Sequence, residues 1–599
     1  MKKHLLLLCA ITMMALSSNA QSKQIWWGYF NESDASNLEY SGYLGYSQAC
    51  TIDAAIFIPA NHPIAGTGKI KSVRFWLGDD LSCINGDLTL WISESLPTDI
   101  SSADYTQKVS KWTLSSRKNE IQLNNSYTIN NKGIYIGYSF PINYKSYPVM
   151  GGGEDVANSF YYRVMGREWE NLSEKGNGSL ALQVLLDGVT LKDNYVSPSD
   201  FGTSYILKGQ TINVPIKITN YGSQPVTSIS YIISTNGVAS AEQTLSVQSL
   251  AFNMSTNVSI PLLSDAEAKK YVKTFTITKV NNAANEATDN TASGSLVTIV
   301  EKPVVVPVVE EFTATWCGWC PIGFDGMEKA KAEFGDKVVL IAVHCRDQMS
   351  IADYAPIAGL TSTYPNSIIN REQTTYPSAS GLKYYINQQL SNKISVAEVQ
   401  AKAVWTSAAK TSILIGANTT FAYSEDKGDY GLAYALIEDG LTNSAWGQAN
   451  NLSKKSGYES YSFWYNSSSE VYGLNFDNVP VAAWNIAKGV DGSVSSRIIE
   501  GYTQSFSYEA DIQDKSLIQD KSKLRIVVML IDRSTGKIVN AAQTNIAEPG
   551  TTAVDGIYSS VNAGETGRYG LDGRKMDTPR RGLNIIRMED GSFRKVMVR

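Results

Sequence analysis

Cysteine and histidine are scarce in this chain, which has six cysteines and three histidines among 599 residues. A structural zinc site needs several such ligands at close spacing, and the sequence holds no second Cys-x-x-Cys and no His-x-x-x-His. No metal and no cofactor is therefore predicted. The one pair of cysteines at chemically suggestive spacing is Cys317 and Cys320.

Charge is also sparse. Charged residues make up 18% of the chain, and the net charge is −5. Dedicated nucleic-acid-binding proteins concentrate positive charge, so no nucleic-acid partner is expected. After the N-terminal segment the sequence has no apolar run of about 18 residues, so no transmembrane helix is predicted.

The first 20 residues have the pattern of a secretory signal peptide. Lys2 and Lys3 precede the apolar run Leu5–Ala15, and Ser18-Asn19-Ala20 is a small-residue cleavage site. We expect cleavage after Ala20 and an extracytoplasmic location, either at the cell surface or outer membrane or as a secreted protein. Disulfides persist in such compartments.

Tyrosine is abundant, with 33 residues, and short runs of alternating apolar residues recur along the chain. Both features are typical of strands. The length and the pattern predict a multi-domain, mostly β protein in which β-sandwich modules flank one α/β domain. The predicted segments are a signal peptide 1–20, a β-sandwich 21–188 that resembles jelly rolls, a β-sandwich 189–299 that resembles immunoglobulin-like spacers, an α/β domain 300–396, a β-sandwich 397–548 and a C-terminal segment 556–599.

The first sandwich contains Cys50 and Cys83 as its only cysteines. In an oxidising compartment they predict a structural disulfide, with two buried free thiols as the alternative. The aromatic run Trp26-Trp27-Gly28-Tyr29-Phe30 favours core packing, although a carbohydrate platform is a second interpretation.

The α/β domain is predicted from the order of its elements. The apolar run Val304–Val309 precedes Cys317-Gly318-Trp319-Cys320, then a helical pattern follows, and then the apolar run Val338–Val343. This order is the start of a βαβ unit, in which a Cys-x-x-Cys pair indicates a redox dithiol. A helix N-terminus favours the thiolate, so Cys317 is expected to be the exposed nucleophile and Cys320 the resolving thiol.

This stretch resembles the thioredoxin superfamily through Glu311-Phe312-Thr313-Ala314-Thr315-Trp316-Cys317-Gly318-Trp319-Cys320. The resemblance implies that Glu311 is a buried acid that moves the proton of the resolving thiol. It also implies that Tyr364-Pro365 is the cis-proline element, with Pro365 shaping the substrate groove. Trp316 belongs to the expected site. The implied partners are protein thiols and disulfides.

Other interpretations of the dithiol remain open. Cys317 and Cys320 could bind zinc together with His344-Cys345, form a purely structural disulfide, or belong to an inactive thioredoxin fold that serves as a binding module. His344 is expected near the dithiol because it follows a buried strand, or else it faces water. Cys345 is either buried and inert or a third redox cysteine.

A second resemblance covers about Val304 to Ile546. Glu311-Phe312-Thr313, Ile437-Glu438-Asp439-Gly440, Gln448 and Gly536–Ala541 resemble the Omp-twenty-eight family of outer-membrane proteins, in which a thioredoxin-like domain precedes a β-sandwich. Glu438 and Asp439 could be a catalytic carboxylate pair, but neighbours on a strand point to opposite faces, which favours a turn or surface role.

The basic C-terminal segment resembles type IX secretion sorting signals through three runs. These are Tyr569–Arg574, Gly582–Arg587 and Val596–Arg599. An address read by outer-membrane or secretion machinery accounts for its arginines and lysines without a nucleic acid. The predicted function is an extracytoplasmic thiol–disulfide oxidoreductase. The alternative is a non-enzymatic, adhesin-like surface protein whose thioredoxin-like domain is inactive.

Overall fold

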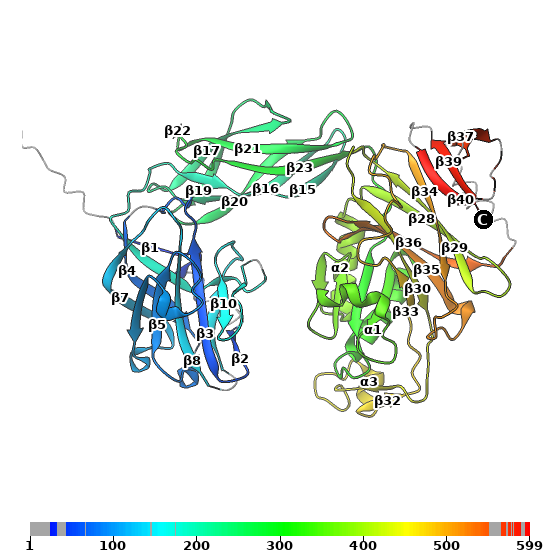
Figure 1. The fold of residues 1–599 in the computed structure, drawn as a ribbon, viewed down its shortest axis with the longest axis horizontal. Helices are drawn as coiled ribbons and strands as arrows, with labels where there is room; N and C mark the ends of the chain where they lie inside the picture. The colour runs from blue at the N-terminus through cyan, green and yellow to red at the C-terminus, as the bar shows by residue number, and fades with distance from the viewer. Residues whose placement is uncertain are drawn as a thin grey trace, which may run out of the picture.

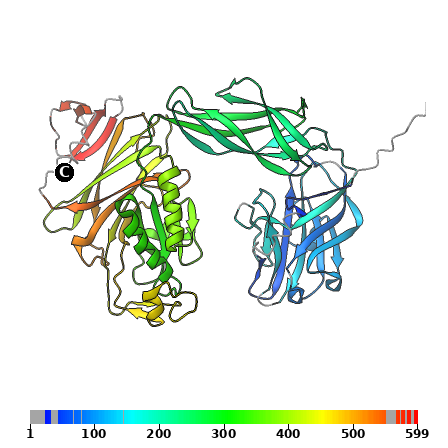
Figure 2. The ribbon, with the colours of Figure 1, turned by 180° about the vertical axis from the view of Figure 1, so that it is seen from behind.

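The structure, a computed structural model, describes most of the chain. The described residues are 24–32, 43–65, 68–78, 80–143, 146–173, 175–549, 565–570, 573–576, 578, 580, 582–588 and 593–598. The predicted signal peptide lies outside them. The chain is multi-domain and mostly β, as predicted, and Figures 1 and 2 show its modules arranged as an arch. The N-terminal sheets form one leg, the next module forms the top, and the α/β sheet with its β neighbour forms the other leg.

The N-terminal leg is a pair of sheets around one apolar core. Its strands are β1 (Ile25–Trp27), β2 (Tyr43–Tyr46), β3 (Cys50–Ile58), β4 (Lys69–Leu77), β5 (Leu88–Ser93), β6 (Tyr105–Val109), β7 (Arg117–Thr128), β8 (Ile134–Ile142), β9 (Ser146–Gly152), β10 (Tyr161–Val164), β11 (Glu170–Asn171), β12 (Ser179–Leu180) and β13 (Leu182–Asp187). One sheet has the order β1-β13-β4-β9-β12, with β2 on β9 and β7 on β4, and the other β11-β10-β3-β8-β5-β6. Trp27 and Phe30 are fully buried, so the aromatic run contributes to packing.

The predicted Cys50–Cys83 disulfide is wrong, because both residues are free thiols. Cys50 pairs with Ile142 on β8, and Ile84 bridges the same residue from the opposite side. Strand β8 therefore separates the cysteines by two strand spacings, roughly 10 Å. A disulfide needs Cα atoms within about 7 Å. The Cys83 thiol instead donates to the Asp80 carbonyl at 2.9 Å.

The top of the arch is a second pair of sheets. Its strands are β14 (Val196–Pro198), β15 (Thr203–Leu207), β16 (Thr211–Asn220), β17 (Val226–Thr235), β18 (Val238–Ala239), β19 (Gln243–Leu250), β20 (Ser255–Leu263), β21 (Lys270–Val280), β22 (Ala283–Ala284) and β23 (Thr291–Ile299). The sheets have the orders β14-β16-β20 and β15-β23-β21-β17-β18, with β19 on β17 and β22 on β21. Alternating residues such as Ile216, Ile229 and Phe275 point inward and form a core of their own.

The α/β part consists of β24 (Val308–Thr313), α1 (Pro321–Phe334), β25 (Val339–His344), β26 (Asn366–Ile369), β27 (Gln373–Thr375) and α2 (Ala379–Asn392). The sheet order is β25-β24-β26-β27, with β24 and β25 parallel. The predicted helix near Ser378–Lys393 is α2, and the Ser378 hydroxyl caps it by accepting from Gly381 N at 3.2 Å. Helices α1 and α2 pack on one face of the sheet over Val309 and Leu340.

The C-terminal β module forms one continuous sheet with the order β33-β30-β35-β36-β28-β29-β34. These strands are β28 (Ala397–Trp405), β29 (Ser412–Phe421), β30 (Tyr430–Glu438), β33 (Val479–Trp484), β34 (Thr503–Asp511), β35 (Leu524–Asp532) and β36 (Ile538–Ala547). The sheet folds over itself, since Tyr434 on β30 stacks on Tyr508 of β34 at 4.7 Å between ring centres. Between β30 and β33 lies the cap segment, residues 439–478, with β31 (Gly447–Ala449), α3 (Ser462–Asn466) and β32 (Glu470–Tyr472).

The second face of the α/β sheet is covered by this C-terminal sheet. Phe312, Val343 and Ile368 form one buried cluster with residues of β30, β33, β35 and β36, among them Ala435 and Met529. Parallel sheets are ordinarily covered by helices on both faces. Here a sheet takes the place of one helical layer, so residues 300–396 and 397–548 share a core.

The tail forms a small sheet with the order β38-β37-β39-β40, from β37 (Glu565–Tyr569), β38 (Lys575–Met576), β39 (Gly582–Met588) and β40 (Phe593–Val598). Among the residues that the structure describes, no helix is long and apolar enough to span a membrane.

Candidate active site

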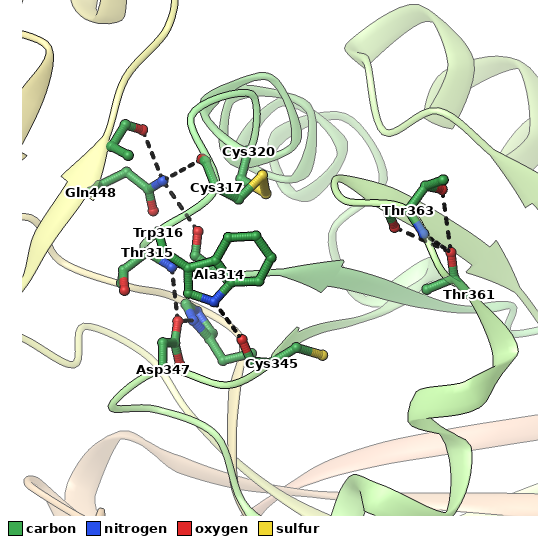
Figure 3. Close-up of a disulfide and its surroundings, with 12 residues drawn as sticks. Ala314, Thr315, Trp316, Cys317, Cys320, Cys345, Asp347, Thr361, Thr363 and Gln448 are labelled. Atoms are coloured by element: carbon green, nitrogen blue, oxygen red, sulfur yellow. Dashed lines mark hydrogen bonds and ion pairs between the residues drawn. A yellow bond between two sulfur atoms is a disulfide. The ribbon is translucent and has the colours of Figure 1, made fainter. Parts of the chain in front are cut away.

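Cys317 and Cys320 form a disulfide in the loop between β24 and α1, with Cα atoms 5.4 Å apart (Figure 3). The loop is a tight turn in which Cys320 N donates to Cys317 O at 3.1 Å. Helix α1 begins at Pro321, so Cys320 is its N-cap residue, and Cys317 lies one turn ahead of it. Cys317 is only 5% exposed, which corrects the expectation of an openly exposed sulfur.

The cap segment covers one side of this loop. Ala449 N donates to Thr315 O and Asn451 N donates to Gly318 O, both at 2.8 Å. A Cβ atom at Gly318 would lie 2.4 Å from the Asn451 side chain, so a larger residue at this position would have to displace that side chain. These contacts join segments more than 130 positions apart, and the sequence carries no local signal for Asn451.

Gln448 holds the same loop through its side chain. The buried amide nitrogen donates to Cys317 O at 3.0 Å and to Ala314 O at 3.3 Å. Figure 3 shows the amide reaching the dithiol loop from the cap side. Sequence reasoning marked Gln448 only as part of a family resemblance, whereas the structure places it in contact with the dithiol loop.

Glu311 lies on β24, the strand that leads to the dithiol loop, and is 2% exposed. Burial raises the pKa of its carboxyl to about 8, and Oε1 has no hydrogen-bond partner among the described residues. A Cβ atom at Gly323 would lie 2.2 Å from this oxygen, so the carboxyl lies against the first turn of α1. At neutral pH the group is largely protonated, and it can exchange a proton with a neighbour.

The neighbouring Glu310 behaves differently because it points to the other face of the sheet. Both of its oxygens accept from Arg371 at 2.8 Å. Arg371 also donates to Ile486 O at 2.6 Å, in the C-terminal module. Glu310 is therefore a structural ion pair at the shared core, and Glu311 is the carboxyl free for chemistry.

Glu311 borders a cavity of about 260 Å³ between α1 and the cap segment. The register of β24 and β25 places Glu311 beside Ala342 and Thr313 beside His344 on one face, and all four line the cavity. Exposed Lys331 and Asp477 stand at its outer edge. A cavity of this size, with Glu311, Thr313, His344 and Gln448 in its lining, can hold water, which would link the buried carboxyl to solvent.

His344 is the last residue of β25 and is buried, so the water-facing interpretation is wrong. Its Nδ1 lies 2.7 Å from Asp347 Oδ2, which also accepts from Thr315 N at 2.9 Å. Burial alone would raise the pKa of Asp347, but the hydrogen bonds from His344 and Thr315 hold it below its ordinary value. His344 thus anchors the dithiol loop through Asp347.

The side of the dithiol away from the cap is formed by Trp316 and Tyr364. Tyr364-Pro365 is a cis peptide, as predicted, and Tyr364 packs against the cysteine pair. The Trp316 indole N–H donates to Cys345 O at 3.0 Å, and its ring meets Tyr364 edge-on at 5.5 Å. Trp316 is 48% exposed, which leaves an aromatic surface beside the dithiol.

Cys345 matches the inert alternative. Its thiol donates to Val343 O at 3.6 Å, and burial raises its pKa. The carboxylate-pair interpretation of Glu438 and Asp439 is wrong. Glu438 accepts from the backbone of residues 519 and 520, whereas Asp439 pairs with Arg525 at 2.8 Å. In the described part of the chain no group of three or more histidine, cysteine or acidic residues could hold a metal.

No protein-family model matches the chain. HBP35 of Porphyromonas gingivalis is a structural neighbour at 15% identity, covering 50% of this chain and 99% of its own, with a TM-score of 0.32. The CARDB domain of PF1109 from Pyrococcus furiosus has 16% identity over 19% of this chain and 99% of its own, with a TM-score of 0.16.

Among curated proteins, thioredoxin X of Arabidopsis thaliana chloroplasts is 34% identical over 100 residues. The match covers 15% of this chain and 52% of thioredoxin X, so the chain spans about half the length of that relative. One stretch of this chain is therefore similar to a thioredoxin.

Proposed function

We propose that the protein is an extracytoplasmic thiol–disulfide oxidoreductase that acts on protein cysteines through Cys317 and Cys320. The observation that carries the proposal is the position of this disulfide at the start of α1, the helix whose first turn lies against the buried carboxyl of Glu311. A helix N-terminus favours a thiolate, and a carboxyl with a pKa of about 8 can accept and release a proton near neutral pH.

In the reducing direction, the Cys317 thiolate attacks one sulfur of a substrate disulfide. A mixed disulfide forms, and the first substrate thiolate leaves and takes a proton from water. Cys320 then gives its proton to Glu311, which must first be in its minor ionised form, and attacks the Cys317 sulfur. The second substrate thiolate leaves, and the Cys317–Cys320 disulfide is restored. The reverse sequence oxidises a substrate dithiol, and both directions balance two electrons.

The surrounding residues have distinct roles in this proposal. Trp316, Tyr364 and Pro365 form the edge along which a substrate strand approaches the sulfurs. Gln448 and His344 fix the dithiol loop and act as positioning residues. The signal-peptide pattern and the resemblances to an outer-membrane family and to sorting signals support action at the cell surface, in the outer membrane or after secretion.

The test is insulin reduction by the full-length protein, together with the reduction potential of Cys317–Cys320. Potentials of such dithiols span roughly −270 to −120 mV, and the measured value fixes the direction of the reaction. We expect Cys317→Ser to lower turnover to background and the matched Cys83→Ser variant, in a turn of the N-terminal leg, to retain it. A disulfide that resists thioredoxin-range reductants would favour the non-enzymatic surface-binding function instead.

A Cys320→Ser variant identifies substrates. The mixed disulfide on Cys317 cannot then be resolved, so partner proteins remain covalently attached and separate under reducing electrophoresis. Absence of any Cys317-linked adduct, in a variant whose Cys317 is shown to be reduced, would contradict the proposed nucleophile.

A further inference from the structure

A cationic side chain lies over the ring of each tryptophan in the dithiol motif. The Arg346 guanidinium lies 5.5 Å from the centre of the Trp316 ring and 5.9 Å from that of Tyr364. On the opposite flank, Lys455 Nζ of the cap segment lies 5.2 Å from the centre of the Trp319 ring. The two cations thus lie over Trp316 and Trp319, which stand before and after Cys317 in the dithiol motif.

Neither cation is neutralised by an acid. Among the described residues no carboxylate forms an ion pair with Arg346 or Lys455, and both side chains are exposed. The acid next to Arg346 in the chain, Asp347, is buried and bonded to His344. Near Lys455, the Glu459 carboxylate accepts from Gly457 N at about 3.0 Å. Arg346 and Lys455 therefore place positive charge beside the dithiol, on a chain whose net charge is −5.

The position of Arg346 is set by the backbone. Its φ is +55°, a left-handed conformation that L residues adopt infrequently, and it follows directly on the Cys345 carbonyl that holds the Trp316 indole. The same short segment therefore fixes the tryptophan and places the cation over it. Aromatic rings hold cations in this way at a partly solvated site, and the held charge remains available to an incoming anion.

We propose that the preferred substrates are protein segments in which acidic residues flank the reacting cysteine. This inference rests on the proposed oxidoreductase function and names its substrate class. The rings of Trp316 and Trp319 would contact the apolar part of the segment, and Arg346 and Lys455 would pair with carboxylates on either side of its sulfur. Complementary charge of this kind speeds encounter and selects among partners more than it changes the chemical step.

The test measures reduction of three peptides by the reduced full-length protein. Each peptide carries one cysteine as a mixed disulfide with 5-thio-2-nitrobenzoate, flanked by aspartates, serines or lysines. Attack by Cys317 on the peptide sulfur releases the coloured thiolate, and attack by Cys320 then releases the peptide thiol and closes the protein disulfide. The neutral small molecule hydroxyethyl disulfide reports basal reactivity without a flanking charge.

We expect the second-order rate constant to be about tenfold higher for the aspartate peptide than for the lysine peptide at low salt. The preference should nearly vanish in roughly 1 M salt, where the screening length is about 3 Å. The rate of resolution by Cys320 should be equal for all three peptides. Equal second-order rate constants for the aspartate and lysine peptides at low salt would overturn the inference.

Charge variants distinguish the effect of Arg346 and Lys455 from that of a change in the net charge of the protein. Arg346→Glu and Lys455→Glu should each reduce the preference several-fold, and the double variant should favour the lysine peptide. Arg346→Lys and Lys455→Arg should retain the preference. Arg497→Glu, an equal charge change in the exposed loop between β33 and β34, should leave it unchanged. A preference that persists in the double variant would also overturn the inference.

Hydroxyethyl disulfide keeps the two proposals distinguishable. If the protein reduces neither this compound nor any peptide, the oxidoreductase function fails, and the substrate class fails with it. If the protein reduces the compound, and if the second-order rate constants for the three peptides are equal to one another, only the acidic-substrate inference fails.

Discussion

The N-terminal and C-terminal halves of the arch use β-sheets in different ways. Each of the first two modules has a core of its own, in which Phe75 and Phe275 are fully buried, although Val297 and Ile299 at the end of β23 join the core of the C-terminal sheet. The α/β sheet instead places Phe312 against the sheet of the next module. A module boundary along the chain therefore separates two cores in the N-terminal half. In the C-terminal half the boundary between residues 300–396 and 397–548 runs through one shared core, and we call this shared interface the seam.

The seam also builds the candidate site. The same C-terminal module that covers Phe312 supplies the cap segment, with Gln448 on the dithiol loop and Lys455 on Trp319. An α/β sheet covered by helices on both faces would have neither contact. The site thus depends on residues from two modules that share one core.

Separating the modules should have the largest effect. A fragment of residues 300–396 exposes Phe312, Val343 and their neighbours, each worth about 1.5–3 kcal/mol of burial. A domain has only about 5–15 kcal/mol of net stability. We expect this fragment to show no cooperative thermal transition, while fragments 189–299 and 300–548 each show one. A cooperative transition of 300–396 alone would place the boundary of the folding unit within the seam.

A matched pair of phenylalanine substitutions tests, in the intact chain, which modules share a core. Phe312→Ala and Phe275→Ala each remove a fully buried ring and should each cost about 3–5 kcal/mol. Phe312→Ala should lower the midpoint temperature of the calorimetric transition in which the dithiol region and the C-terminal sheet unfold together. Phe275→Ala should lower the midpoint temperature of the transition of the top module alone. Separate shifts of the dithiol region and the C-terminal sheet in Phe312→Ala would contradict the shared core.

Both halves contain features that the sequence could not predict. The thioredoxin resemblance predicted the cis Tyr364-Pro365 bond. Local patterns were sufficient for the strand before the dithiol, the dithiol turn and the helix that Ser378 caps. They failed where the answer depended on residues far apart in the chain. The free Cys50 and Cys83 follow from strand order, and the contacts of Gln448 and Asn451 follow from a seam that no periodicity reveals.

The buried carboxyl of Glu311 should make stability depend on pH. Its pKa rises from the ordinary 4.5 to about 8 on folding. Between these values the folded state holds a proton that the unfolded state has released, so stability falls by about 1.4 kcal/mol per pH unit as pH rises, and levels off above about pH 8. Urea unfolding across this range should show the fall in the wild type.

Glu311→Gln should remove that fall, because the amide does not titrate. The variant should be close to the wild type near pH 4.5 and more stable by several kcal/mol at pH 8. Substitution of Glu310 by Gln serves as the contrast, since it leaves Arg371 without its anion and should destabilise the protein. An unchanged pH slope in Glu311→Gln would show that the carboxyl ionises freely where it lies.

The smallest expected effect concerns the contact across the seam. Gln448→Ala leaves the carbonyls of Cys317 and Ala314 without their side-chain donor, at a cost of about 1–3 kcal/mol. Because the Cys317 N–H closes its turn on that same Ala314 carbonyl, its amide hydrogen exchange should accelerate by about tenfold.

Gln504→Ala is the control, because it removes a buried glutamine that accepts from Ser495 N at 2.7 Å elsewhere in the C-terminal module. It should cost similar stability and leave Cys317 exchange unchanged. Equal acceleration in both variants would mean that the cap acts on the dithiol only through global stability, whereas acceleration confined to Gln448→Ala would show that the second module holds the dithiol turn directly.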